Sequence, residues 1–135
     1  PKVVRLNHPE FKALAGAQPT REALVAYAHD NTITIGLSGE TDLVTDGERF
    51  AAIANGHPLM AKVTAMGCAA SALIAACLSV EPDAWCATAA ALVMIGVAGE
   101  LAAAQAKGPG SFAVAIIDTL HNLDAQTLSA HARVN

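Results

Sequence analysis

The sequence predicts an α/β fold of three layers, in which helices cover a small, incomplete central sheet. Apolar and β-branched runs at 3–6 and 32–37 are typical of strands, and helical segments lie between them. An Asp-Gly pair at 46–47 predicts a hairpin between 41–45 and 49–54. Apolar helical segments fill the second half. Because this pattern supplies only about four strands, we expect one face or edge of the sheet to lack its partner.

Start signals locate the first helix, and apolar patterning locates most of the others. Asn7 followed by Pro9 and Glu10 is a combination that begins a helix. Residues 124–135 lose apolar periodicity and are expected to fray at the end of a single domain, 1–135. The expected helices span residues 9–15, 21–29, 67–80, 84–106 and 111–123.

The composition of the 135 residues excludes several classes of protein. Hydrophobic residues make up 53% and charged residues 15%, so the chain is not a disordered one. Aromatic residues make up 4%, so aliphatic side chains must fill the core. The net charge of -4 and the lack of any Lys/Arg run argue against a nucleic-acid partner.

Neither the cysteines nor the uncharged stretches indicate a zinc site or a membrane span. Residues 63–80 carry no charge, but small residues dominate them, which predicts a buried helix without contact with a membrane. Cys77 and Cys86 lack disulfide or metal spacing and are expected to be buried, reduced thiols in the cytoplasm. Residues 1–12 have no signal-peptide pattern. Since the first residue is Pro1, processing and origin in a longer protein both stay open.

A turn of small residues at 64–68 opens the helix expected at 67–80. Small side chains let the backbone come close to a ligand. The N–H groups of a helix start point the same way and carry partial positive charge, which suits a transferring phosphoryl group. Cys68 lies in this first turn, where the dipole favours a thiolate. The pattern also fits an ordinary helix start that binds nothing.

Three polar residues near strand ends are further candidates. Glu10 could close a capping box with Asn7, or it could reach Mg²⁺ beside nucleotide phosphates, directly or through water. Arg5 could pair with a phosphate or with a surface carboxylate. Ser38 could hydrogen-bond a phosphate or cap the turn that follows it.

An ordered set of motifs runs along the chain from about residue 3 to 124. The motifs are Val44-Thr45-Asp46-Gly47, Asn55-Gly56-His57-Pro58-Leu59-Met60, residues 63–68 with Ser71-Ala72, Gly108-Pro109-Gly110-Ser111-Phe112, and Leu120-His121-Asn122-Leu123. In order and spacing they resemble the hydroxyethylthiazole kinase family. The resemblance implies a ribokinase-like sandwich, a helix-rich C-terminal half, and transfer of the γ-phosphoryl group of ATP, with Mg²⁺, to a thiazole alcohol in thiamin biosynthesis.

The resemblance also implies roles on the nucleotide side of the site. Arg5 aligns with an ATP-contacting Arg, and Ser38 stands where the family usually has an ATP-contacting Thr. Asn7 and Glu10 align with a motif that serves phosphate and Mg²⁺, with Glu10 as the metal ligand.

The same resemblance assigns the start of the helix at 67–80 to the anion hole and to catalysis. Gly67 belongs to the anion hole, and Cys68 occupies the position where most ribokinase-like kinases have an Asp base. Ala65 replaces a substrate-contacting Gly, because the family's usual Gly-Thr-Gly-Cys reads Ala-Met-Gly-Cys here. The Ala65 methyl group narrows the approach without removing its N–H.

Length is the larger departure, because members of the family are roughly twice as long. The absent N-terminal half is expected to hold the first strands, an acidic Mg²⁺ motif and much of the thiazole pocket. In the family the active site lies between subunits of a homotrimer. Two alternatives stay open: a non-catalytic remnant that binds nucleotide or oligomerises, and another ribokinase-like vitamin kinase. Cys68 argues against the second, which would carry Asp there.

Overall fold

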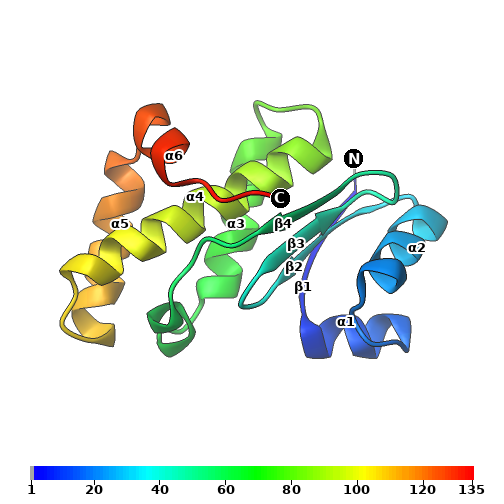
Figure 1. Cartoon of the computed structure of the whole chain (residues 1–135), viewed down its shortest axis with the longest axis horizontal. Coiled ribbons are helices and arrows are strands. Elements are labelled where there is room, and N and C mark those ends of the chain that lie inside the picture. The colour runs from blue at the N-terminus through cyan, green and yellow to red at the C-terminus, as the bar shows by residue number, and fades with distance from the viewer. Residues whose placement is uncertain (1) are drawn as a thin grey trace.

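The computed structural model describes residues 2–135 as a four-stranded sheet with helices on both faces (Figure 1). The strands, the hairpin and the five helices expected from the sequence are confirmed to within a few residues. The elements, in chain order, are β1 (Val3–Asn7), α1 (His8–Ala15), α2 (Arg21–Asn31), β2 (Thr34–Ser38), β3 (Asp42–Thr45), β4 (Phe50–Ile53), the 3₁₀ helix η1 (Pro58–Lys62), α3 (Met66–Leu78), α4 (Ala84–Gln105), α5 (Pro109–Asn122) and α6 (Ala125–His131).

The sheet has the order β1-β2-β3-β4, with β1 and β2 parallel and the other pairs antiparallel. A parallel pair needs a crossover connection, which α1 and α2 provide. Arg5 lies opposite Gly36, and Asn7 lies opposite Ser38. The carboxyl ends of β1 and β2 therefore lie at the same level of the sheet.

Successive residues of the strands face two different cores, which makes the three layers. Ile35 and Leu37 pack with Phe11 and Leu24 under α1 and α2. Val44 faces the opposite way, into the larger core formed with α3, α4 and α5. Figure 1 shows α1 and α2 on one side of the sheet and the remaining helices on the other. The predicted α/β class is thus confirmed.

The long helix α4 lies at the centre of the larger core. A side chain at Gly36 would meet the methyl group of Thr88 at 3.0 Å, so glycine lets the sheet and α4 approach closely. Within residues 2–135, α4 is the one helix long and apolar enough to cross a membrane, and 56% of its apolar window is buried in the domain. The uncharged stretch 63–80 forms only the shorter α3.

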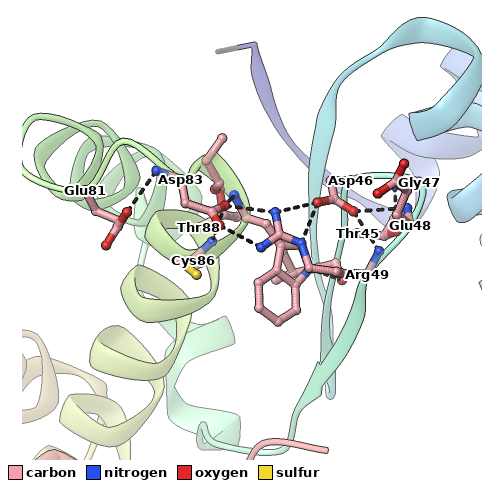
Figure 2. Close-up of polar contacts among 12 residues, drawn as sticks. Thr45, Asp46, Gly47, Glu48, Arg49, Glu81, Asp83, Cys86 and Thr88 are labelled. Carbon is pink, nitrogen blue, oxygen red and sulfur yellow. Dashed lines mark hydrogen bonds and ion pairs between the residues drawn. The ribbon is translucent and has the colours of Figure 1, made fainter.

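An ion-pair network joins the β3–β4 hairpin to the start of α4 (Figure 2). Arg49 donates from Nε to Asp46 at 2.8 Å and from Nη1 to Asp83 at 2.6 Å. Asp83 also caps α4 by accepting from the N–H groups of Trp85 and Cys86. The hydrogen bond from Arg49 holds the pKa of Asp83 well below its usual range. The network therefore fixes the hairpin on the helix.

Residues 124–135, which the sequence predicts to fray, form α6 and a bridge to β4 in the structure. Asp124 caps α6 by accepting from the N–H of Thr127 at 2.8 Å. Beyond the helix, Val134 forms an antiparallel bridge with Ile53 of β4. The sequence pattern fails here because α6 has only 7 residues and the tail pairs with a strand far away in the sequence.

Arg133 fastens this tail to the domain. Its guanidinium pairs with Glu100 of α4 and donates to the carbonyl of Ala54 at 2.9 Å. Its backbone N–H donates to Asn55 Oδ1 at 2.7 Å, and its carbonyl accepts from the N–H of Ala54 at 2.9 Å. The β4 edge of the sheet is therefore covered by the C-terminal residues.

The β1 edge differs, because no strand lies beside its outer side anywhere in residues 2–135. Val4 and Leu6 pack under the α1–α2 layer, whereas Val3 packs on the side of α3. A parallel strand that is covered on both faces is normally an interior strand of an α/β sheet. Within residues 2–135, β1 is therefore an edge strand that has helices on both of its faces.

Candidate functional site

The candidate site lies where the carboxyl ends of β1 and β2 meet the start of α3. Arg5 is the centre of this group, and its side chain is 16% exposed. Its Nε donates to Ser71 Oγ on α3 at 3.1 Å, and its Nη1 donates to Ser38 Oγ at 3.4 Å. Its Nη2 lies 3.7 Å from a carboxylate oxygen of Glu10. One guanidinium thus joins two strands and two helices.

Asn7 and Glu10 form a complete capping box at the start of α1. Asn7 Oδ1 accepts from the N–H of Glu10 at 2.9 Å, and Glu10 Oε2 accepts from the N–H of Asn7 at 2.8 Å. The same Oε2 faces Arg5, while Oε1 has no hydrogen-bond partner in the described part of the chain. The cap fixes the carboxylate beside Arg5 and leaves one oxygen available.

The first turn of α3 presents unpaired N–H groups. Its N-cap residue, Ala65, has φ 66° and ψ 11°, and no side chain in residues 2–135 caps the helix. The first backbone bond within the helix comes from Ala69 to the carbonyl of Ala65, so the N–H groups of Met66, Gly67 and Cys68 precede the ladder. Such a turn has the polarity that an anion requires.

Gly67 brings Arg5 against this helix start. A Cβ at position 67 would lie 3.0 Å from Nη2 and 3.1 Å from Cζ of Arg5, so the guanidinium rests on the glycine. Glycine therefore allows a cation and the polar N–H groups of α3 to share one place. Positive charge beside a helix start is well suited to phosphate oxygens.

Cys68 is exposed at the third position of α3 and is a free thiol. Cys77 and Cys86 are half-buried, whereas the sequence predicted that both would be buried. Burial raises the pKa of the Cys77 and Cys86 thiols. Of the three, Cys68 is the one that lies beside the candidate anion site.

Two residues of the site carry no predicted role. Ser71 accepts from Arg5 and donates to the carbonyl of Gly67 at 3.0 Å, so it orients the guanidinium over the helix start. The sequence signal for Ser71 is its spacing of one helical turn from Gly67, which places the two residues on the same side of the helix. Asp42 accepts from the N–H of Gly39 at 3.0 Å, beside Ser38. Its place depends on the β2–β3 pairing, which the sequence pattern did not reveal.

A hollow of about 210 Å³ adjoins the site between β1 and α3. Arg5 and Ser71 line its polar part, and the side chains that line the rest are Val3, Ile74, Ala75 and Leu78. A larger hollow of about 390 Å³ lies near the turn at Asp46 and Glu48 and contains none of the candidate residues. The smaller hollow is therefore the one relevant to the site.

The fit to Mg²⁺ depends on Glu10. Residues 2–135 contain no group of three or more His, Cys, Asp or Glu side chains that could hold a metal alone. In nucleotide enzymes Mg²⁺ is commonly bound by one or two carboxylates together with phosphate oxygens and water. A single fixed carboxylate beside a phosphate site is compatible with that arrangement.

Solved structures support the architecture. The hydroxyethylthiazole kinase protein of Pyrococcus horikoshii OT3 superposes with a TM-score of 0.93 at 34% identity, covering 99% of this chain and 54% of that one. The hypothetic protein SMU.573 of Streptococcus mutans has a TM-score of 0.75 at 16% identity over 89% of this chain and 46% of that one, which shows a shared fold alone.

Sequence relatives indicate the same family as the Pyrococcus horikoshii structure. Hydroxyethylthiazole kinase from Granulibacter bethesdensis is 43% identical over 98% of this chain and 53% of its own length. The enzyme of the same name from Zea mays is 37% identical over all of this chain and 55% of its own length. The chain thus spans about half the length of the relatives that it matches. The hydroxyethylthiazole kinase family model matches residues 11–126, and the chain belongs to this family.

Proposed function

We propose that the chain forms the nucleotide-binding side of a hydroxyethylthiazole kinase. The reaction transfers the γ-phosphoryl group of ATP to the hydroxyl of 4-methyl-5-(2-hydroxyethyl)thiazole in thiamin biosynthesis. The observation that carries the proposal is the contact of the Arg5 guanidinium with Gly67, at the uncapped start of α3. A cation and free N–H groups that meet at one point favour a highly charged phosphate ligand.

Each candidate residue has a role in this proposal. Arg5 and the Ser38 hydroxyl bind phosphate oxygens of ATP, while Gly67 and its neighbours in α3 receive the γ-phosphoryl group. Asn7 holds the Glu10 carboxylate in place through the capping box. Glu10 would hold Mg²⁺ on the metal side of the phosphates, and the ion would supply positive charge to the phosphate oxygens.

Cys68 is the proposed catalytic base. The alcohol oxygen forms a bond to the γ-phosphorus while the bond to the ADP oxygen breaks, and the hydroxyl proton passes to the Cys68 thiolate. In a loose phosphoryl-transfer transition state, positioning and charge stabilisation matter more than the strength of the base. A thiol at this place is therefore compatible with the reaction. Ala65 lies in the same turn, and we assign it the contact with the substrate.

The substrate side of the enzyme lies largely outside this chain. The chain covers 53% of the Granulibacter bethesdensis relative, so we assign much of the thiazole pocket to the remaining length. We further propose that the complete protein is a cytoplasmic homotrimer that acts on a small thiazole alcohol, without a nucleic-acid or membrane partner. The open β1 edge supports the proposal that further chain of the complete protein lies beside β1.

The half-length match and the open β1 edge also favour a second candidate, a non-catalytic remnant that binds nucleotide or oligomerises. Turnover of the thiazole alcohol separates the two candidates. A kinase half gains turnover when the missing half is supplied, whereas a remnant binds ATP but stays inactive in that mixture.

Calorimetric titration of the 135-residue chain with ATP and Mg²⁺ tests the nucleotide site. We expect Arg5→Ala to weaken binding at least about tenfold, because a charged hydrogen bond contributes about 1.5–3 kcal/mol. Arg21→Ala is the control and should leave ATP affinity unchanged, because Arg21 lies on α2 over the ring of Phe50 of β4, away from the site. No ATP binding by the wild-type chain, or equal binding by Arg5→Ala, would overturn the proposal.

A further inference from the structure

Asp42 is a carboxylate within the candidate site that the roles above do not use. It lies one step beyond the Leu37–Leu43 pair, which brings it beside Ser38. Residues alternate between the faces of a strand, so Asp42 shares the face of Val44, which packs in the core with α3 and α4. Ser38 lies on this face too, opposite to Leu37.

The contacts of Asp42 run to the turn that follows Ser38. Its Oδ1 accepts from the N–H of Gly39 at 3.0 Å. From the other direction, a Cβ at Gly39 would lie only 2.8 Å from Nε2 of His8 on α1. The backbone after Ser38 is therefore held between Asp42 and the ring of His8, and it has little room to move.

Burial disfavours the charged form of the Asp42 carboxyl group. Burial raises its pKa to about 6, although the Gly39 N–H and the positive charge of Arg5 both act to lower it. Perturbed carboxylates in such positions are typical of functional sites.

We propose that Asp42 is a positioning residue of the nucleotide site, which holds the Gly39 N–H so that the Ser38 hydroxyl meets the phosphates beside Arg5. The inference rests on the proposed function, because it names a residue that serves the same ATP site. Asp42 acts through the turn and does not touch phosphate, since two negative groups in contact would repel each other.

Three variants of the 135-residue chain separate this role from plain turn formation. Asp42→Ala removes both the acceptor and the charge, whereas Asp42→Asn keeps an oxygen acceptor of the same shape. Asp30→Ala is the matched control, because Asp30 is exposed on α2 with 76% of its side chain accessible. For each variant, the ATP dissociation constant is measured with Mg²⁺ present, and urea unfolding shows that the domain is folded.

We expect Asp42→Ala to raise the ATP dissociation constant about tenfold, the loss expected for one hydrogen bond to a charged group. Asp42→Asn should stay within about threefold of wild type, because it retains the acceptor. A merely structural role predicts lower stability of Asp42→Ala with unchanged ATP affinity of the folded protein, and that result would overturn the inference. Failure of the wild-type chain to bind ATP would instead overturn the proposed function, and the inference with it.

Discussion

The β4 side of the domain pairs its polar groups, whereas the β1 side has an open strand edge and an uncapped helix start. On the β4 side, the tail bonds to Ala52 and Ala54, and Arg133 pairs with Glu100. Burial acts to raise the pKa of Glu100, but hydrogen bonds from Arg133, Gly56 and Asn55 hold it below its usual value. The polar groups of this side are therefore paired within the domain.

On the β1 side, the edge strand has no neighbour within residues 2–135. The helix start of α3 is uncapped, and Ala65 adopts a left-handed conformation that suits glycine better. Burial raises the pKa of Asp42. Strained backbone conformations and carboxylates with perturbed pKa values are frequent at functional sites, where interactions in the rest of the fold compensate for them. The contrast therefore favours the β1 and α3 side of the domain as the place of the proposed site.

Removal of residues 132–135 should have the largest effect on stability, because it opens the paired side. Three backbone bonds join Ala52 and Ala54 to Arg133 and Asn135. At about 1 kcal/mol for each bond, we expect a loss of about 3 kcal/mol in the free energy of unfolding, measured with urea. Arg133→Ala keeps the backbone bonds and should cost less than half as much. An unchanged unfolding midpoint after the deletion would show that the tail does not contribute.

Asp42→Asn should stabilise the domain at neutral pH, by about 1–2 kcal/mol after allowance for partial exposure. The folded-state pKa of Asp42 is about 6, above the ordinary 3.8. Protonated Asp42 therefore favours folding at low pH, and this contribution is lost as the pH rises from about 4 to 6. The advantage of the Asn variant should vanish near pH 4, as followed by unfolding at several pH values.

Glu100→Gln provides the opposite case from the paired side of the domain. The pKa of Glu100 is lowered, so its charge stabilises the fold at neutral pH and this contribution is lost as the pH falls. We expect Glu100→Gln to destabilise the domain at pH 7 and to approach wild type in acid. The same sign for Asp42→Asn and Glu100→Gln at pH 7 would contradict the contrast between the two sides.

Ala65→Gly should add about 1 kcal/mol of stability, because φ 66° strains any residue with a side chain. Ala69→Gly, one turn later on the exposed face of α3, is the matched control and should cost about 1 kcal/mol. Thermal unfolding of both variants measures the pair. If Ala65→Gly were as damaging as Ala69→Gly, the left-handed start of α3 would be wrong.

Ala72→Lys should have the smallest effect on folding, within about 0.5 kcal/mol, because the residue is exposed on α3. We expect Ala72→Lys to change the self-association of the chain instead. The open β1 edge and the apolar outer face of α3 predict self-association of the chain, which a charge on this face weakens. Sedimentation at several concentrations compares it with Ala104→Lys, an exposed position on α4 that should leave association unchanged.

Most of the local structure can be predicted from the sequence, and so can the grouping of Arg5, Ser38 and Glu10. The Asn7 cap, the Asp-Gly turn and the small residues before α3 each act over a few positions, so they are visible without tertiary information. The family resemblance then groups Arg5, Ser38 and Glu10, and the structure brings these side chains together.

Long-range pairing sets the limit of such prediction. The tail could not be placed, because its Arg133 binds Asn55, a residue 78 positions away. Asp42 could not be assigned either, since only the antiparallel register of β2 and β3 brings it beside Ser38. The helical spacing of Ser71 from Gly67 is visible in the sequence, but its contact with Arg5 depends on the packing of α3 against β1.

The most direct test of a nucleotide half-site is a chimera in which this chain replaces the matching half of the Granulibacter bethesdensis relative. The two sequences are 43% identical over 98% of this chain, so the chimera should fold. We predict ATP-dependent phosphorylation of the thiazole alcohol by the chimera, its loss on Arg5→Ala, and no turnover by the chain alone. A folded chimera that binds ATP without turnover, or an active isolated chain, would contradict the account.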